Sequence, residues 1–364
     1  MKNLKLKFTV LLLMAASLSF APKVSLAATD GLPAALLERN SPVYQLDHTT
    51  SVAVTSDGAY LVNLNQNGAS KKLGQQQALD VHVLNSPAKV VVLTAGPNNQ
   101  LEKHVYNADG LELSISKFPL KAPAQGKVKW VAPAAAAKER LMVQEGNQFT
   151  LYSNAGKPIA KYNAQAEDLK DMYMGVGVMD WDFTAYPNLA IKYSGERIMA
   201  WDYFVRIVNL YSKTVTSIPR LEIDQQLQIN SQGQLNVWSS YSYEGITPPS
   251  AVQPDQVTAQ SFHALYSLST GKPLADHQRI FEQLSGEKPG GWNTQVVGST
   301  VFVQDLATEQ WSLYPVSSQA AIAKDLTGVA KGSKFLGFDS SSETAFFVTA
   351  AEGSAPTFNK VKVK

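Results

Sequence analysis

The most constraining feature of this sequence is a short phrase that recurs along most of its 364 residues. In each copy an apolar or aromatic strand end leads into a polar turn, and another run of β-forming residues follows. Seven copies, some degenerate, have turns centred on Gly68, Gly110, Gly156, Lys213, Gly271, Glu309 and Gly353. The intervals between these turns are 42, 46, 57, 58, 38 and 44 residues. A period of this size predicts a repeat architecture.

The segments between the turns favour strands over helices. Residues 90–93 are apolar throughout, which predicts a strand covered on both faces. Tyr60, Val62 and Leu64 alternate with other side chains, as in a strand with one buried face. Short helices at most are expected, and their candidate segments are 31–39, 277–284 and 319–326. The fold class predicted from these patterns is all-β.

Two of the turns resemble those of known β-propellers. Ser269-Thr270-Gly271-Lys272 and Asn154-Ala155-Gly156-Lys157 are similar to the strand–turn–strand hairpins of WD-repeat and quinoprotein-type blades. The resemblance implies a β-propeller with seven four-stranded blades of about 48 residues each. No Trp-Asp dipeptide stands at the end of a predicted blade, no Gly-His dipeptide occurs, and the tryptophan that follows the turn in quinoprotein repeats is missing. The resemblance therefore implies an architecture but no cofactor, and a pair of β-sandwich domains remains the alternative fold.

The N-terminus has the parts of a secretory signal peptide. Lys2, Lys5 and Lys7 precede the apolar run 8–20, and small residues follow at 25–28. We expect residues 1–27 to be a signal peptide, 28–42 a linker or short helix, and 43–364 a single propeller domain. The expected location is secreted, extracellular or in the cell envelope, with no membrane span after cleavage.

Charge and cysteine content exclude several classes of protein. Removal of residues 1–27 takes away four lysines and no acid, so 28 basic residues remain against 30 acidic ones and the formal charge is −2. Outside the leader there is no cluster of five or more Lys or Arg, so we expect no nucleic-acid partner. The chain contains no cysteine, which excludes disulfides, thiolate metal sites and a cysteine nucleophile. The oligomeric state is not indicated.

Catalytic and metal-binding motifs are not recognisable. The sequence has no nucleophile elbow, zinc-protease motif, P-loop or EF-hand ladder. Its five histidines are scattered without ligand spacing. We therefore expect no catalytic residues, no metal and no cofactor.

The most unusual stretch runs from residue 168 to 202, where aromatic side chains alternate with carboxylates. Aromatic faces stack on sugars or apolar groups, and neighbouring carboxylates accept hydrogen bonds from hydroxyls or cations. The ligand-binding candidates, including one from a later proline-rich loop, are Asp180, Trp181, Asp182, Trp201, Asp202 and Tyr243. The alternative is that the aromatic residues pack between blades while the aspartates cap hairpins.

The lengths of the connections between strands also favour this region as a functional site. The two longest intervals are consecutive, and their excess lies at residues 168–190 and 243–257. If the recurring turn joins the third and fourth strands of a blade, both insertions emerge on the opposite face. Adjacent long loops on one rim are common sites of function.

These features favour an exported, non-catalytic binding module that presents aromatic-rich loops to a protein or a cell-envelope polysaccharide. One alternative is a carbohydrate-active hydrolase or lyase that uses paired carboxylates, Asp180 with Asp202 or Glu222. Another alternative is a structural extracellular protein without a discrete ligand.

Overall fold

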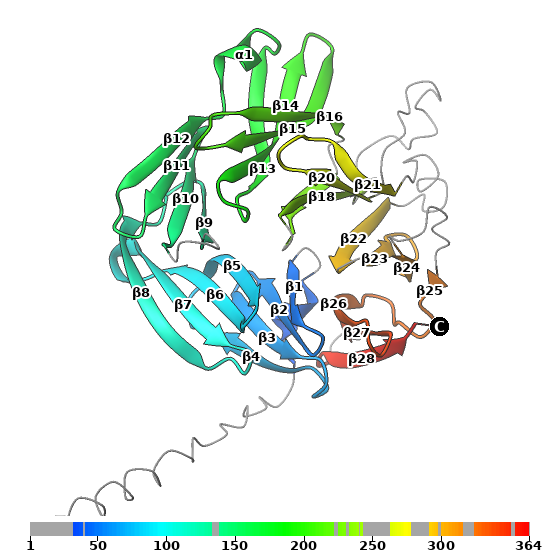
Figure 1. Ribbon diagram of the computed structural model, residues 1–364. Coiled ribbons are helices and arrows are strands. Elements are labelled where there is room, and N and C mark those ends of the chain that lie inside the picture. Colours follow the sequence, from blue (N-terminus) through cyan, green and yellow to red (C-terminus); the bar gives the residue numbers. More distant parts are fainter. Residues whose placement is uncertain are drawn as a thin grey trace, which may run out of the picture.

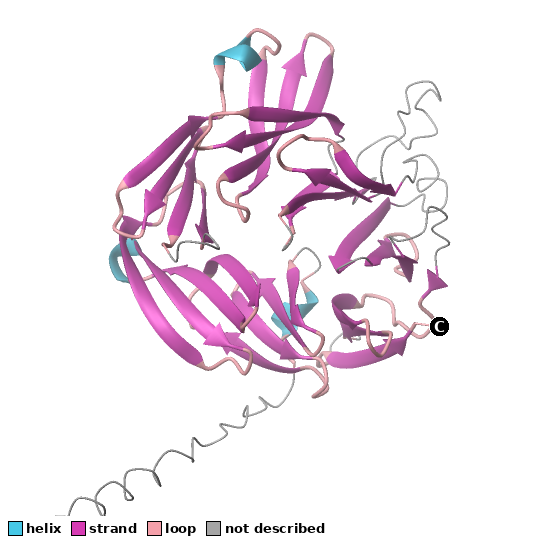
Figure 2. Cartoon of the chain, in the orientation of Figure 1, coloured by secondary structure: helices cyan, strands magenta, loops and turns pink. Residues whose placement is uncertain are grey.

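Seven antiparallel sheets follow one another around a ring (Figure 1). The computed structural model describes residues 32–38, 41–132, 138–221, 225–230, 233–239, 241–242, 263–277, 291–297, 300–315, 324–350 and 354–363. The ring of small sheets is a β-propeller of seven blades, as the repeats predict, and not a pair of stacked sandwiches. Among the described residues, helix is confined to three single turns (Figure 2), which are η1 (Ala34–Leu37), η2 (Pro97–Asn99) and α1 (Glu167–Lys170).

The first four blades each contain four strands paired in chain order. Blade 1 consists of β1 (Val43–Asp47), β2 (Thr50–Thr55), β3 (Gly58–Asn63) and β4 (Ala69–Leu73). Blade 2 consists of β5 (Ala78–Asn85), β6 (Ala88–Ala95), β7 (Gln100–Asn107) and β8 (Glu112–Lys121). Blade 3 consists of β9 (Lys127–Val131), β10 (Arg140–Glu145), β11 (Gln148–Ser153) and β12 (Pro158–Asn163). Blade 4 consists of β13 (Gly175–Asp182), β14 (Asn188–Arg197), β15 (Ala200–Asn209) and β16 (Val215–Leu221).

The last three blades are less regular. Blade 5 consists of β17 (Gln225–Ile229), β18 (Gln234–Ser239), β20 (His263–Ser267) and β21 (Pro273–His277). Blade 6 consists of β19 (Tyr241–Ser242), β22 (Gly291–Val297), β23 (Thr300–Asp305), β24 (Trp311–Pro315) and β25 (Lys324–Asp325). Blade 7 consists of β26 (Lys334–Asp339), β27 (Thr344–Thr349) and β28 (Thr357–Lys362).

The prediction of four strands in every blade is therefore wrong for the described parts of blades 6 and 7, which have five and three. The extra strand of blade 6 is β19, which follows β18 of blade 5 in the chain but pairs with β22. Of the segment 31–39, the described residues 32–38 contain the 3₁₀ turn η1 in place of the expected helix. The two other expected helices lie largely outside the described residues, and their described ends, at His277 and at Lys324–Asp325, are strands.

The recurring turns are hairpins that join the third and fourth strands of blades 1 to 6. All six central residues adopt a left-handed backbone, with φ between 60° and 76°, and they are Gly68, Gly110, Gly156, Lys213, Gly271 and Glu309. This conformation is costly for most side chains and cheap for glycine. The repeat was therefore visible in the sequence because four of the six hairpins use glycine there. The seventh turn, at Gly353, lies outside the described residues.

Apolar side chains pack between neighbouring blades. In β6, Val90 and Val92 face blade 1, whereas Val91 and Leu93 face blade 3. A strand sandwiched on both faces needs apolar residues at every position, which explains the unbroken run at 90–93. Comparable clusters join blades 3 and 4, blades 4 and 5, and blades 6 and 7.

Blades 1 and 7 meet without a shared strand, because β1 pairs within its own sheet and β28 ends the last one. Side-chain contacts connect these two blades instead of backbone hydrogen bonds between strands. The Gln45 amide donates to the Phe338 carbonyl oxygen at 2.6 Å and accepts from the Phe338 N–H at 3.1 Å. Leu36 of η1 is fully buried in a cluster with Leu336 of blade 7 and Val62 of blade 1. Residues 32–38 thus close the ring.

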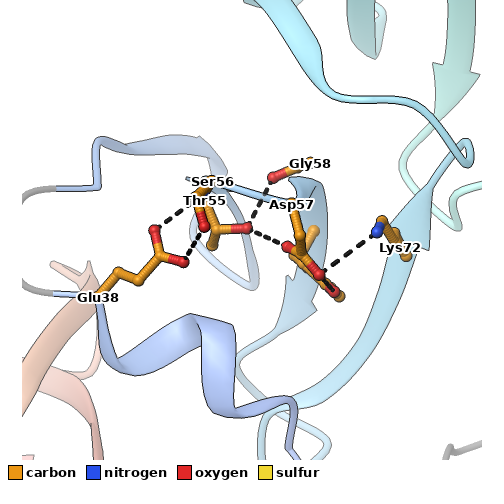
Figure 3. A network of polar contacts seen from close by, with 7 residues as sticks. Glu38, Thr55, Ser56, Asp57, Gly58 and Lys72 are labelled. Atoms are coloured by element: carbon orange, nitrogen blue, oxygen red, sulfur yellow. Dashed lines mark hydrogen bonds and ion pairs between the residues drawn. The ribbon is translucent and has the colours of Figure 1, made fainter.

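A polar network fixes this N-terminal segment to blade 1 (Figure 3). Glu38 accepts hydrogen bonds from the Ser56 backbone N–H at 2.8 Å and from the Ser56 hydroxyl at 2.5 Å. In the same turn, Asp57 accepts from Thr55 and lies 3.3 Å from the Lys72 ammonium. The hydrogen bonds from Ser56 hold the pKa of Glu38 below its ordinary value. Glu38 is therefore charged when it binds the turn.

Candidate functional site

Blade 4 carries a hairpin that projects beside α1 (Figure 1). Its strands β14 and β15 pair over ten consecutive residues, from Asn188 opposite Asn209 to Arg197 opposite Ala200. The turn at the end consists of Ile198 and Met199, which are apolar where a solvent-facing turn would favour Gly, Asn or Asp. The segment after α1 runs alongside, because the Met174 N–H donates to the Glu196 carbonyl oxygen at 2.9 Å. We call residues 172–174 and 196–202 together the blade-4 tip.

Five large apolar side chains of the blade-4 tip face solvent. The exposed fractions are 88% for Ile198, 96% for Met199, 72% for Met174, 56% for Trp201 and 51% for Met172. Single exposed apolar residues are common, but a group on adjoining segments is typical of an interaction surface.

An aromatic stack holds the blade-4 tip in place. The Arg197 guanidinium lies 5.3 Å from the centre of the Tyr173 ring, and Tyr173 stacks on Phe204 with centroids 5.3 Å apart. Phe204 in turn stacks on buried Tyr193 at 5.1 Å. Asp202 joins the outer end of the stack, since it lies 2.5 Å from Arg197 and accepts from the Tyr173 hydroxyl at 3.3 Å. The stack runs from the surface into the core, so the exposed side chains stand on an ordered base.

The candidates Trp181 and Asp182 do not belong to this surface. Trp181 is only 1% exposed, packs between blades 3 and 4, and donates its indole N–H to Gln144 at 2.6 Å. Asp182 is 3% exposed and accepts from the Ile229 N–H of blade 5 at 2.7 Å. The prediction that these two residues face a ligand is corrected by their burial: the tryptophan fills the blade interface, and the aspartate links two blades.

Of the remaining candidate residues, some lie on the blade-4 tip and others do not. Trp201 and Asp202 lie on the blade-4 tip, although Asp202 is already engaged by Arg197. Asp180 lies on β13, with a side chain 45% exposed and 3.5 Å from the Lys127 ammonium. Tyr243 and Glu222 lie outside the described residues. Asp180 and Asp202 thus each face a cation of their own, Lys127 and Arg197.

A charged cluster that the sequence did not indicate joins the first strands of blades 2, 3 and 4, which lie nearest the centre of the ring (Figure 1). The Lys129 ammonium on β9 lies 3.6 Å from Asp182 and 5.4 Å from the Trp181 ring. Asp80 on β5 accepts from the Trp130 N–H at 2.9 Å. Burial disfavours the Lys129 charge, but Asp182 and Asp80 outweigh this and raise its pKa. The cluster links three blades and is a structural element.

The pKa values of the two aspartates in this cluster are shifted in opposite directions, upward for Asp80 and downward for Asp182. The shift of Asp80 leads to a prediction about the pH dependence of stability. Burial raises the pKa of Asp80 to about 6 despite Lys129. The folded state then binds a proton more tightly than the unfolded state, so stability falls as the pH rises from about 4 to about 6. We expect Asp80→Asn to become more stable relative to the wild type across this window, by about 1–3 kcal/mol. Urea unfolding of both proteins at pH 4 and pH 7.5 measures the difference. A difference that does not change with pH would contradict the assignment.

Neither a metal-binding cluster nor a membrane-spanning helix is found among the described residues. Within the described ranges, no group of three or more His, Asp or Glu side chains is placed to hold a metal ion. No helix in that part of the chain is long and apolar enough to cross a bilayer.

The blade-4 tip overlaps the stretch that stood out in the sequence, but its most exposed residues were not all among the candidates. Met172, Met174, Ile198 and Met199 all lie within the stretch 168–202, but none of them was among the ligand-binding candidates. The available signal was an Ile-Met pair between Arg197 and Ala200, where hairpin turns rarely place two large apolar residues.

Comparisons with known proteins agree with the ring of sheets but are distant. No family model matches the chain, and no curated protein matches its sequence. It is similar to the β-propeller domain of the Trilobed protease from Pyrococcus furiosus, with 10% identity and a TM-score of 0.47 over 86% of this chain and 91% of that one. It is also similar to Kluyveromyces lactis Hsv2, with 12% identity and a TM-score of 0.42 over 88% of this chain and 98% of that one. The WD40 domain of SCAP from fission yeast is 9% identical to it, with a TM-score of 0.41 over 90% of this chain and 88% of that one.

At this distance the comparisons carry no argument about activity or partners. The assignment of the fold rests on the seven sheets themselves, whose order and pairing are those of a degenerate β-propeller.

Proposed function

We propose that this chain is an exported, non-catalytic binding module that holds a protein partner at the blade-4 tip. The observation that carries the proposal is the group of exposed apolar side chains on a hairpin anchored by the stack from Arg197 to Tyr193. A surface that is ordered before binding loses less conformational entropy when a partner docks. Export is proposed from the leader-like residues 1–27.

A protein fits this surface better than a polysaccharide does. Sugar sites surround an aromatic face with hydrogen-bonding groups, whereas the residues at the turn of this hairpin are apolar, and Asp202 beside Trp201 already contacts Arg197 and Tyr173. Ile198, Met199 and Met174 offer apolar and adaptable contacts instead. Tryptophan and methionine are enriched where proteins bind one another, and tryptophan dominates binding energy there.

The proposal is tested by photo-crosslinking in cells that naturally produce the protein. A photoreactive benzoylphenylalanine replaces Met199 in one variant and Tyr211 in another, because Tyr211 is 59% exposed but lies at the other end of β15. We expect a discrete protein adduct from position 199 alone. Excess wild-type chain should suppress it, whereas excess Ile198→Asp chain should not.

An adduct of the same yield at both positions, or none at position 199, would overturn the blade-4 tip as the binding surface. A glycan array probed with wild type and Trp201→Ala covers the other ligand class. Glycan binding that depends on Trp201 would replace the protein partner with a polysaccharide.

A further inference from the structure

The charges around the blade-4 tip are unevenly balanced. Residues 167–174 and 196–202, together with Arg206, which pairs with Asp168, include five acids and three cations. All three cations are engaged: Lys170 lies 2.7 Å from Glu167, Arg197 lies 2.5 Å from Asp202, and Arg206 binds Asp168. Two carboxylates are left over.

The two remaining carboxylates border the apolar side chains. Asp171 is exposed and immediately precedes Met172. Glu196 is half-buried, and its backbone oxygen accepts from the Met174 N–H. Neither has an ion-pair partner among the residues that the structure describes. The exposed apolar group is therefore edged by two uncompensated negative charges.

We propose that the partner is a protein surface on which an apolar pocket or side chain is bordered by Lys or Arg. This inference rests on the proposed function and specifies the chemistry of its partner. Opposite charges at the rim of an interface speed association and select the partner, while the apolar centre provides most of the affinity. The Asp171 and Glu196 carboxylates take the role of the rim, and Ile198, Met199 and Trp201 take the role of the centre.

The same charges disfavour two other occupants. A second copy docking tip to tip would bring four uncompensated carboxylates together across an apolar contact, which is repulsive. An anionic membrane surface would be repelled for the same reason.

The probe is a phage-displayed library of random twelve-residue peptides, selected on the purified wild-type chain and counter-selected on the Ile198→Asp/Met199→Asp variant. We expect the enriched peptides to combine an aromatic or aliphatic residue with neighbouring Lys or Arg. For synthetic versions, Kd should rise about tenfold on Asp171→Asn/Glu196→Gln and also when salt rises from about 0.05 to 0.5 M.

A matched double variant provides the control. Asp109 and Glu145 are exposed acids on blades 2 and 3 without an ion pair in the described structure, and Asp109→Asn/Glu145→Gln should leave Kd within about twofold. Peptides that bind the tip but lack basic residues, or whose Kd is unchanged by Asp171→Asn/Glu196→Gln, would overturn this inference and leave the proposed function standing. The absence of any tip-dependent peptide would count against both.

Discussion

Asp182→Ala is expected to lower the free energy of unfolding by about 3–5 kcal/mol, the loss typical of breaking a buried ion pair. The carboxylate accepts from the backbone N–H groups of Thr184 and Ile229 and faces the Lys129 ammonium at 3.6 Å. Its removal leaves a buried donor on blade 5 and takes from Lys129 the carboxylate that contributes most to stabilising its charge. Urea unfolding followed by tryptophan fluorescence measures the loss.

Asp180→Ala is the matched control, since Asp180 lies on the same strand and also faces a lysine, but with a side chain 45% exposed. We expect it to cost less than about 1 kcal/mol. Equal losses for the two variants would contradict the role of Asp182 as a link between blades.

The Asp182 contribution also has a definite pH dependence. Burial opposes the charged form, but Lys129 and the hydrogen bonds outweigh it and hold the pKa of Asp182 below its ordinary value. The stabilisation is therefore complete above the unfolded pKa of about 4 and is lost as the pH falls through the folded value.

Leu36→Asp is expected to destabilise the protein by a similar amount, about 3–5 kcal/mol, because it places a charge in the cluster that joins blades 1 and 7. No described strand is shared between these blades, so η1 and the Gln45–Phe338 hydrogen bonds carry the closure. The melting temperature should fall, and limited proteolysis should cut the N-terminal segment first.

The control for this prediction lies on the same turn. Ala34 is exposed, and Ala34→Asp should change stability by less than about 0.5 kcal/mol. If Leu36→Asp were as stable as Ala34→Asp, η1 would not be part of the closure.

Much of the fold could be predicted because it rests on local rules. A left-handed hairpin residue favours glycine, so Gly68, Gly110, Gly156 and Gly271 marked the repeat in the sequence. Lys213 and Glu309 adopt the same backbone without glycine, and in the sequence they stand in degenerate copies of the phrase. The pairing of β19 with the next blade could not be anticipated, because it depends on where two sheets meet in space.

In the candidate site, too, some features follow from local sequence and others depend on the three-dimensional arrangement. Aromatic and acidic residues at 180–182 and 201–202 look alike in sequence, yet Trp181 is buried between blades while Trp201 stands on a projecting hairpin. The difference arises from the length of β14 and β15, which pair over ten residues. Composition cannot distinguish a tryptophan that packs between blades from one that faces solvent.

The most direct test of this account is the affinity of the crosslinked partner for two variants of the purified chain. Ile198→Asp/Met199→Asp removes the apolar centre of the blade-4 tip, whereas Tyr211→Ala removes a comparably exposed aromatic residue at the other end of β15. We predict a Kd at least about a hundredfold weaker for the first variant and within about twofold of the wild type for the second. Equal affinities for both variants, with both chains folded, would contradict the claim that blade 4 carries the binding surface.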